Sequence, residues 1–246
     1  MDARDRLAAF RRGDWPWVLG HRGAAALAPE NTLAAVRAGR RAGADGIEID
    51  VRATRDGALS VIHDATLARL AARPEHVRDL LLSDLRGARV GGEPIPTLVE
   101  VLDEAEGLLV NVELKSDPKA ADLAPRVADQ LRSRQGDRVL VSSFDPWVLR
   151  RLRKVAPEIP TGLLMDPGRP PWLYGAWLRR LAGVRAIHPH TSLCHVAAIA
   201  RWRAAGLLIV AWTANDAAEV RRLDQLGVDV LIADDPAQAR AALRAS

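Results

Sequence analysis

The sequence predicts a (β/α)8 barrel, and three observations lead to that expectation. Short aliphatic runs alternate with longer amphipathic stretches, which is the pattern of parallel strands joined by crossover helices. About eight such strand–helix units fit into 246 residues, the usual length of this barrel. The first predicted strand is followed by His21-Arg22-Gly23-Ala24 rather than by a glycine-rich nucleotide loop, which argues against an open doubly wound sheet.

Nine segments are short, mostly aliphatic and bounded by turn residues, and each is a predicted strand. They are Trp17–Leu19, Ile47–Val51, Leu59–Ile62, Leu109–Leu114, Val139–Ser142, Gly162–Met165, Ala186–His188, Leu207–Trp212 and Val230–Ala233. This is one strand more than the barrel needs.

The surplus lies in the pair formed by the second and third of these segments, because Asp56-Gly57 between them is typical of a β-hairpin turn rather than of a crossover. If these two residues form the whole loop, the hairpin register places His63 directly across from Asp50.

Helical periodicity fills most of the intervals between the strands. The predicted helices are Asn31–Arg41, Thr97–Ala105, Ala120–Arg134, Pro146–Val155, Cys194–Ala205, Ala217–Leu226 and Pro236–Arg244. The segment Arg69–Pro96 has little strand pattern, so we expect a short excursion on the barrel there. No repeat or linker indicates a second domain, and we expect a single domain over residues 1–246.

Composition excludes several classes of protein. Hydrophobic residues make up 48% of the chain and charged residues 27%, which excludes a disordered or membrane-embedded chain. The 35 basic and 31 acidic side chains leave a net charge of +4 with no block of like charges. Nucleic acid is therefore not an expected partner, whereas a small phosphorylated substrate is compatible with this balance.

Cellular location is inferred from cysteine usage and from the first residues. Cys194 is the one cysteine, so the chain forms no internal disulfide. The opening MDARDRLAAFRRG lacks the apolar stretch and small-residue cleavage site of a signal peptide. We expect a soluble, cytoplasmic protein, and the sequence leaves its oligomeric state open.

Acidic residues interrupt one of the most apolar predicted strands. In Gly46-Ile-Glu-Ile-Asp-Val51, Glu48 and Asp50 are two positions apart, so both side chains point to the same face. Two carboxylates that face inward repel each other unless a cation lies between them. This spacing predicts a metal site.

The same spacing returns in a second strand, where Glu113 and Lys115 share a face. An ordinary ion pair is the simpler interpretation. The chain, however, contains three lysines and 32 arginines, and one of those lysines lies beside an acid at the carboxyl end of a strand. Catalytic side chains of parallel barrels collect at those ends.

Two histidines also end predicted strands. His21 follows the first strand, and His63 follows the third. A single histidine is most often a neutral, hydrogen-bonded residue, but two of them near a carboxylate cluster favour an acid/base pair.

Taken in order, these motifs resemble the glycerophosphodiester phosphodiesterase family. The resemblance extends from Gly20 to about Pro236 and depends on the ordered set rather than on any one motif. The motifs are His21-Arg22-Gly23, Pro29-Glu30-Asn31-Thr32, Glu48-x-Asp50, Thr54-x-Asp56-Gly57, His63-Asp64, Glu113-x-Lys115, Ser143-Phe144, Trp212-Thr213-x-Asn215 and Gly227-Val228-Asp229.

The resemblance implies a barrel of the phospholipase C-like phosphodiesterase type and hydrolysis of glycerophosphodiesters to sn-glycerol 3-phosphate and an alcohol. It also implies roles for seven residues. Glu48, Asp50 and Glu113 are the expected metal ligands, His21 and His63 the general acid/base pair, and Arg22 and Lys115 the phosphate ligands.

Three carboxylates without sulfur form a hard, oxygen-lined site that suits one Mg2+ or Ca2+ ion rather than Zn2+. The sequence leaves open which of these ions binds, which histidine is the acid, and whether water or a substrate hydroxyl attacks first. It also leaves open a lysophospholipase D-like activity on the same barrel, and a phosphate-binding barrel without catalysis is disfavoured because all seven residues are present.

Three further predictions concern neighbouring residues. Glu30 and Asn31 are expected to support the site or to cap the helix that follows. Trp212 lines the glycerol pocket or belongs to the core. The aromatic segment around Trp172, Tyr174 and Trp177 suits contact with a membrane, although a helix packed on the barrel is the favoured alternative.

Overall fold

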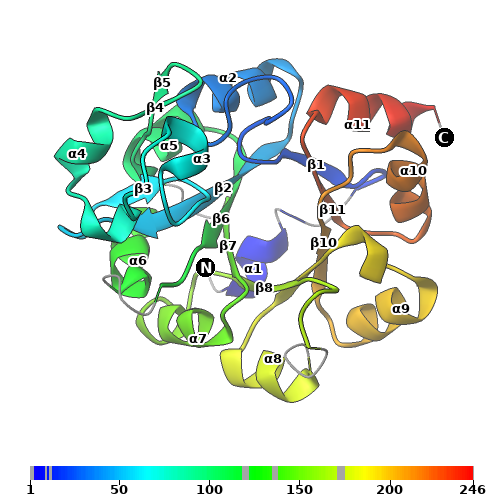
Figure 1. Cartoon of the computed structure of the whole chain (residues 1–246). Coiled ribbons are helices and arrows are strands. Elements are labelled where there is room, and N and C mark those ends of the chain that lie inside the picture. Colours follow the sequence, from blue (N-terminus) through cyan, green and yellow to red (C-terminus); the bar gives the residue numbers. More distant parts are fainter. Residues whose placement is uncertain are drawn as a thin grey trace.

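The computed structural model describes residues 3–8, 10, 13–117, 122–134, 138–170 and 175–245. Eight parallel strands form a closed ring, and a helix follows each of them on the outside (Figure 1). Because β1 pairs with both β2 and β11, the ring has no open edge at this position. The predicted (β/α)8 barrel is confirmed.

The ring strands follow one another around the barrel in chain order. They are β1 (Trp17–Gly20), β2 (Gly46–Ala53), β6 (Leu109–Leu114), β7 (Val139–Ser143), β8 (Thr161–Met165), β9 (Ala186–Pro189), β10 (Leu208–Ala211) and β11 (Val230–Ala233).

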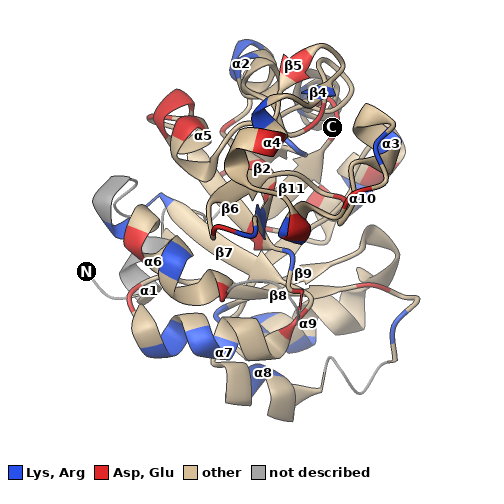
Figure 2. Ribbon diagram, turned by 60° about the vertical axis from the view of Figure 1, so that its left-hand side comes forward, with Lys and Arg blue, Asp and Glu red and all other residues tan. Residues whose placement is uncertain are grey.

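The outer helices lie between consecutive strands. They are α2 (Leu33–Arg41), α5 (Leu98–Glu104), α6 (Leu123–Arg134), α7 (Pro146–Val155), α8 (Ala176–Ala182), α9 (Val196–Ala204), α10 (Ala217–Gln225) and α11 (Pro236–Arg244). Basic and acidic residues both occur on the helices seen in Figure 2, and Lys and Arg recur along α7. None of the helices in the described part of the chain has the length and apolar character needed to cross a membrane.

Each strand buries both of its faces. In β6, Val110, Val112 and Leu114 pack outward against the helices. Leu109 belongs to a separate cluster inside the ring, so the alternate residues Asn111 and Glu113 also face the interior. This two-sided burial explains why the strands are nearly continuous apolar runs interrupted only where a polar side chain points inward.

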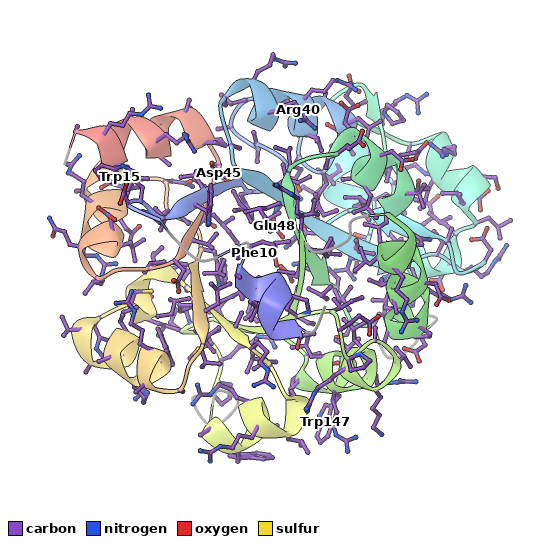
Figure 3. The ribbon with its side chains drawn as sticks, turned by 180° about the vertical axis from the view of Figure 1, so that it is seen from behind. Phe10, Trp15, Arg40, Asp45, Glu48 and Trp147 are labelled. Carbon is purple, nitrogen blue, oxygen red and sulfur yellow. The ribbon has the colours of Figure 1, made fainter. Side chains whose placement is uncertain are left out.

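The N-terminal segment closes one end of the barrel. Figure 3 shows α1 (Ala3–Ala8) and Phe10 in front of the ring when the molecule is seen from behind. Leu7 and Phe10 are buried and belong to the same interior cluster as Leu19 and Leu208. This end is filled by side chains, so the polar site lies toward the opposite ends of the strands.

The surplus strand is β3 (Leu59–Val61), which pairs antiparallel with β2 as predicted. The predicted register is wrong by one residue, because the amide of Ile62, not of His63, meets the carbonyl of Asp50 (2.9 Å). Thr54 N–H donates to the Ala58 carbonyl (3.0 Å), which leaves a loop of three residues. Only Gly57 in this loop has a left-handed backbone (φ 78°), whereas a two-residue type I′ turn needs two such residues.

The expected excursion follows β3. It contains α3 (Ala68–Ala71), the 3-10 helix η1 (Val77–Asp79), α4 (Leu82–Arg86) and the short hairpin of β4 (Arg89–Val90) and β5 (Glu93–Pro94). Leu67, Val77, Leu85 and Ile95 form its own small hydrophobic cluster, which gives the segment a structure that the sequence did not predict.

Helix α2 packs very closely on the turn that follows β1. A Cβ atom added at Gly39, in the middle of α2, would lie 2.4 Å from the carbonyl oxygen of Gly23. In Gly39→Ala, helix propensity alone would add about 1 kcal/mol of stability. We expect the overlap to outweigh it and the net loss to be about 1–3 kcal/mol.

This loss is measured as a lower midpoint of thermal unfolding. Gly13→Ala is the matched control, because no heavy atom lies within 4 Å of the added Cβ and its midpoint should not change. A Gly39→Ala variant as stable as the wild type would contradict the close contact.

Candidate active site

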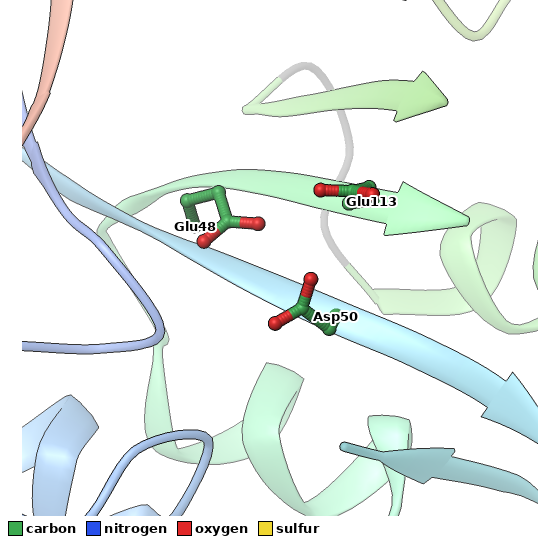
Figure 4. Close-up of side chains that lie close together, drawn as sticks. All are labelled: Glu48, Asp50 and Glu113. Atoms are coloured by element: carbon green, nitrogen blue, oxygen red, sulfur yellow. The ribbon is translucent and has the colours of Figure 1, made fainter. Parts of the chain in front are cut away.

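Three buried carboxylates meet at the carboxyl ends of β2 and β6. Glu48, Asp50 and Glu113 point toward one another, and each contributes an oxygen that lies within 4.8 Å of the other two (Figure 4). Asp50 is the lateral neighbour of Glu113 in the sheet. Their relative exposures of 3%, 1% and 7% show that water solvates none of them freely.

Their charges are unevenly compensated. Burial and the nearby Asp50 raise the pKa of Glu48 to about 8, and burial also raises the pKa of Glu113. For Asp50, burial acts in the same direction, but Lys115, His63 and Arg22 overcome it and lower the pKa to about 2. The surrounding cations therefore favour the charged form of Asp50 but do not offset the burial of Glu48 and Glu113.

Lys115 supplies the nearest positive charge. Its Nζ lies 3.0 Å from Asp50 and 2.5 Å from Glu113. Burial disfavours the ammonium ion, yet these carboxylates raise the pKa of Lys115 above its usual value. Lys115, which was predicted to share a face with Glu113, thus lies against two of the three carboxylates.

Arg22 approaches the cluster from the turn after β1. Its backbone N–H donates to Glu48 (3.0 Å), and its guanidinium lies 3.5 Å from Asp50. Glu30 accepts a hydrogen bond from the same guanidinium (2.7 Å). The left-handed backbone of Arg22 (φ 51°) turns the chain so that its amide and its side chain both face the acids.

Asn31 supports Asp50 from both sides. Its Nδ2 donates to the Asp50 carboxylate (2.8 Å), and its Oδ1 accepts from the Asp50 backbone N–H (3.1 Å). The alternative that Asn31 caps the helix is wrong, because Thr32 is the N-cap residue of α2 and accepts from Ala35. The expectation that Asn31 supports the site agrees with these contacts.

In each of the two histidines, the ring nitrogen Nδ1 lies beside a carboxylate. Nδ1 of His21 lies 2.5 Å from Asp234, and Nδ1 of His63 lies 2.7 Å from Asp64. Nε2 of His21 faces the cluster, 4.0 Å from Glu48. In both rings Nδ1 is engaged, which orients the imidazole and leaves Nε2 for another partner.

The surroundings of the two rings differ. Burial opposes the charged form of His21, but the hydrogen bond to Asp234 and the charge of Glu48 raise its pKa. For His63, burial prevails and lowers the pKa despite the charge of Asp50.

Asp234 and Arg69 were not predicted as site residues. Asp234 is held by Asn215, which donates to its carboxylate (2.5 Å) and accepts from its backbone N–H (2.9 Å). Arg69 pairs with Asp64 (2.6 Å) and with Glu30 (2.8 Å), and thereby links the His63 side of the site to the Arg22 side. The motifs Trp212-Thr213-x-Asn215, Pro29-Glu30-Asn31-Thr32 and His63-Asp64 contain the partners of these two residues, but not Asp234 or Arg69 themselves.

Trp212 lies at the mouth of the barrel and packs against its interior cluster. Its indole N–H donates to the His188 carbonyl (2.8 Å), and its ring meets Phe144 and His190 edge to face (5.7 and 5.3 Å between centroids). His188 itself is fully buried, and burial lowers its pKa to about 3. It is a neutral interior residue.

Part of the aromatic segment is outside the described residues, namely Trp172 and Tyr174. Trp177 is described, lies on α8 and is 57% exposed. Leu178 and Ala182 of the same helix are buried, so the favoured alternative of a helix packed on the barrel is confirmed for residues 176–182.

Comparisons with known proteins agree with this arrangement. The sequence profile of the glycerophosphoryl diester phosphodiesterase family matches residues 21–238. A glycerophosphodiester phosphodiesterase of Caldanaerobacter subterraneus is 33% identical over 235 residues, which cover 89% of this chain and 94% of that protein.

Solved structures show the same fold. A phosphodiesterase of Oleispira antarctica in complex with the product sn-glycerol-3-phosphate superposes with a TM-score of 0.83 and 28% identity, covering 94% of this chain and 97% of that one. A glycerophosphodiester phosphodiesterase of Thermotoga maritima gives 0.77 and 30%, covering 90% and 96%. With its barrel and its cluster of acids and histidines, the chain belongs to the glycerophosphoryl diester phosphodiesterase family.

Proposed function

We propose that this protein hydrolyses glycerophosphodiesters to sn-glycerol 3-phosphate and an alcohol. The observation that carries the proposal is the convergence of Glu48, Asp50 and Glu113 beside two imidazoles at the carboxyl ends of barrel strands. The related Oleispira antarctica phosphodiesterase binds sn-glycerol-3-phosphate as product, which supports this substrate class.

Glu48, Asp50 and Glu113 fit a divalent cation. Three oxygen donors within 4.8 Å and no sulfur form a hard site, which suits Mg2+ or Ca2+. A cation bound there stabilises the negative charge that builds on the phosphate oxygens during hydrolysis. Asn31 keeps Asp50 in place for this role through two hydrogen bonds.

Arg22 and Lys115 are the proposed phosphate ligands. Both border the carboxylates and remain charged, because the acids beside them raise the pKa of each. A phosphodiester gains negative charge as its phosphorus is attacked. Losing one fixed donor to such charge costs about 10²-fold or more in rate.

His21 and His63 are the proposed proton carriers. The carboxylates on their Nδ1 atoms orient both rings, so Nε2 is the atom that exchanges a proton with substrate. One ring removes the proton of the attacking oxygen, and the other protonates the leaving alcohol. Trp212 is the proposed wall of the glycerol pocket because it lies at the mouth of the barrel.

We further propose that residues 1–246 form one domain and that the protein acts in the cytoplasm. The motifs and the barrel together occupy nearly the whole described chain, which supports a single domain. The one cysteine, Cys194, is buried and unpaired, in keeping with a reducing compartment.

The metal assignment is tested with glycerophosphocholine as substrate, and a parallel reaction with lysophosphatidylcholine, followed by release of choline, tests the lysophospholipase D-like alternative. We expect a chelator to abolish release of sn-glycerol 3-phosphate and Glu113→Gln to lower the rate by about 10²-fold or more. Glu106→Gln, at an exposed position, is the control and should keep the wild-type rate. Undiminished activity in chelator would remove the metal from the proposal.

The orientation of His21 is tested with Asp234→Asn. The amide keeps the size of the side chain but removes the charge, so we expect kcat to fall by roughly 10²-fold or more while KM changes little. Asp235→Asn is the matched control, because Asp235 caps α11 and asparagine caps equally well.

His21→Ala, which removes the imidazole itself, is expected to abolish turnover while the protein remains folded in a thermal unfolding experiment. Near-wild-type kcat in Asp234→Asn would show that the carboxylate does not position the ring. Near-wild-type kcat in His21→Ala would remove this histidine from the chemistry.

A further inference from the structure

A second pocket lies between α8 and α9, beyond the carboxyl end of β8. Its volume is about 440 Å³, and it is lined by residues of both helices, of the segment after β8 and of the 3-10 helix η3 (Thr191–Leu193). The proposed metal ligands, proton carriers and phosphate ligands do not line it. The pocket is therefore separate from the site described above.

Three arginines line this pocket: Arg169, Arg179 and Arg201. Elsewhere in the protein, arginines such as Arg78 and Arg240 pair with acids at 2.7 Å. Within the described part of the chain, no carboxylate lies within ion-pair distance of the three pocket arginines. Arg169 and Arg201 are exposed and Arg179 is half-buried, so the three guanidinium groups are accessible to an anion from solution.

Arg179 is the most constrained of the three. Its Nε is buried and finds no hydrogen-bond partner among the described residues. Burial and the neighbouring Arg201 and Arg180 lower its pKa from the usual arginine value. Such crowding of like charges is unfavourable unless an anion relieves it.

The pocket also has one acid and an apolar wall. Asp166 lines it, and its carboxylate accepts the backbone N–H of Gly168 (2.7 Å). Trp202 and Leu193 form part of the wall. Three positive charges against one negative charge, next to an apolar wall, suit an anion that has an organic part.

The pocket borders the mouth of the barrel. The guanidinium of Arg169 lies over the ring of Phe144 (4.5 Å to the centroid), and Phe144 in turn packs against Trp212. One of the three arginines is thereby held in a defined position without using a carboxylate.

We propose that this pocket binds a phosphate monoester, with the phosphate on Arg169, Arg179 and Arg201 and the organic group against the apolar part of the wall. Guanidinium forks match phosphate oxygens in pairs, and a phosphate monoester offers three terminal oxygens with nearly two negative charges. A carboxylate, with two oxygens and a single charge, would leave part of the arginine cluster unpaired.

The test is calorimetric titration of the protein with phenylphosphonate, a phosphate-like anion whose carbon–phosphorus bond is not a substrate for ester hydrolysis. Chelator is present throughout, so that no metal competes for the probe. We expect binding of one molecule per chain. Arg179→Met and Arg201→Met, which keep an apolar stem, should each weaken it by about tenfold or more.

Two controls separate the pocket from other sites. Arg180→Met changes an exposed arginine of the same helix that does not line the pocket, and Glu113→Gln changes the carboxylate cluster. Both should bind as the wild type does. Absent binding, or binding that Glu113→Gln removes and Arg179→Met leaves intact, would overturn the proposal.

Thermal unfolding gives an independent readout. Phenylphosphonate should raise the unfolding midpoint of the wild type and not that of Arg179→Met. Without the anion, Arg179→Met should be at least as stable as the wild type, because one of the crowded charges is gone. If this variant fails to fold, Arg201→Met decides the question.

Sedimentation with phosphatidylcholine vesicles that contain phosphatidic acid distinguishes a lipid headgroup from a soluble ligand. Vesicle binding that Arg179→Met removes assigns a lipid phosphate monoester, and phenylphosphonate binding without vesicle binding assigns a soluble one. Both results support the pocket. Vesicle binding that Arg180→Met weakens as much as Arg179→Met, without phenylphosphonate binding, would contradict it.

Discussion

The repulsion among three buried carboxylates is the constraint on which the site depends. Glu48, Asp50 and Glu113 are held together by the pairing of β2 with β6, not by attraction between their side chains. Barrel closure supplies the free energy that keeps the carboxylates close, and the positive charges of Lys115 and Arg22 reduce the free-energy cost of their repulsion. A site of this kind needs a rigid scaffold, and the two apolar clusters on either side of the strands provide it.

The fold was largely predictable because strands buried on both faces have an unmistakable composition. What the pattern did not determine was the register of the β2–β3 hairpin, which depends on the Thr54–Ala58 hydrogen bond and on the backbone of Gly57. Turn geometry, and not the hydrophobic pattern, determines which of two registers one residue apart the hairpin adopts. Helix α8 was expected only as the favoured alternative to a membrane contact, because a helix of seven residues is too short to show a clear helical periodicity in the sequence.

The acids of the site were predictable for a local reason, since two residues of spacing in a strand place side chains on one face. The carboxylate that supports His21 was not, because it comes from a distant part of the chain. Asp234 is 213 positions away from His21. Arg69, which pairs with Asp64 beside His63, belongs to the excursion, whose sequence showed no clear pattern. Only the closed ring reveals which polar residues at the strand ends become neighbours.

The contact between His21 and Asp234 joins the first strand of the ring to the last. During synthesis on the ribosome, the three carboxylates and both histidines emerge while the final third of the chain is still missing. The partner that orients His21 is among the last residues to appear, and it reaches the imidazole only after β11 has docked beside β1. Under the proposed role of His21, nascent or truncated chains lack the contact that orients its ring, and the rate of hydrolysis reports whether the ring of strands has closed.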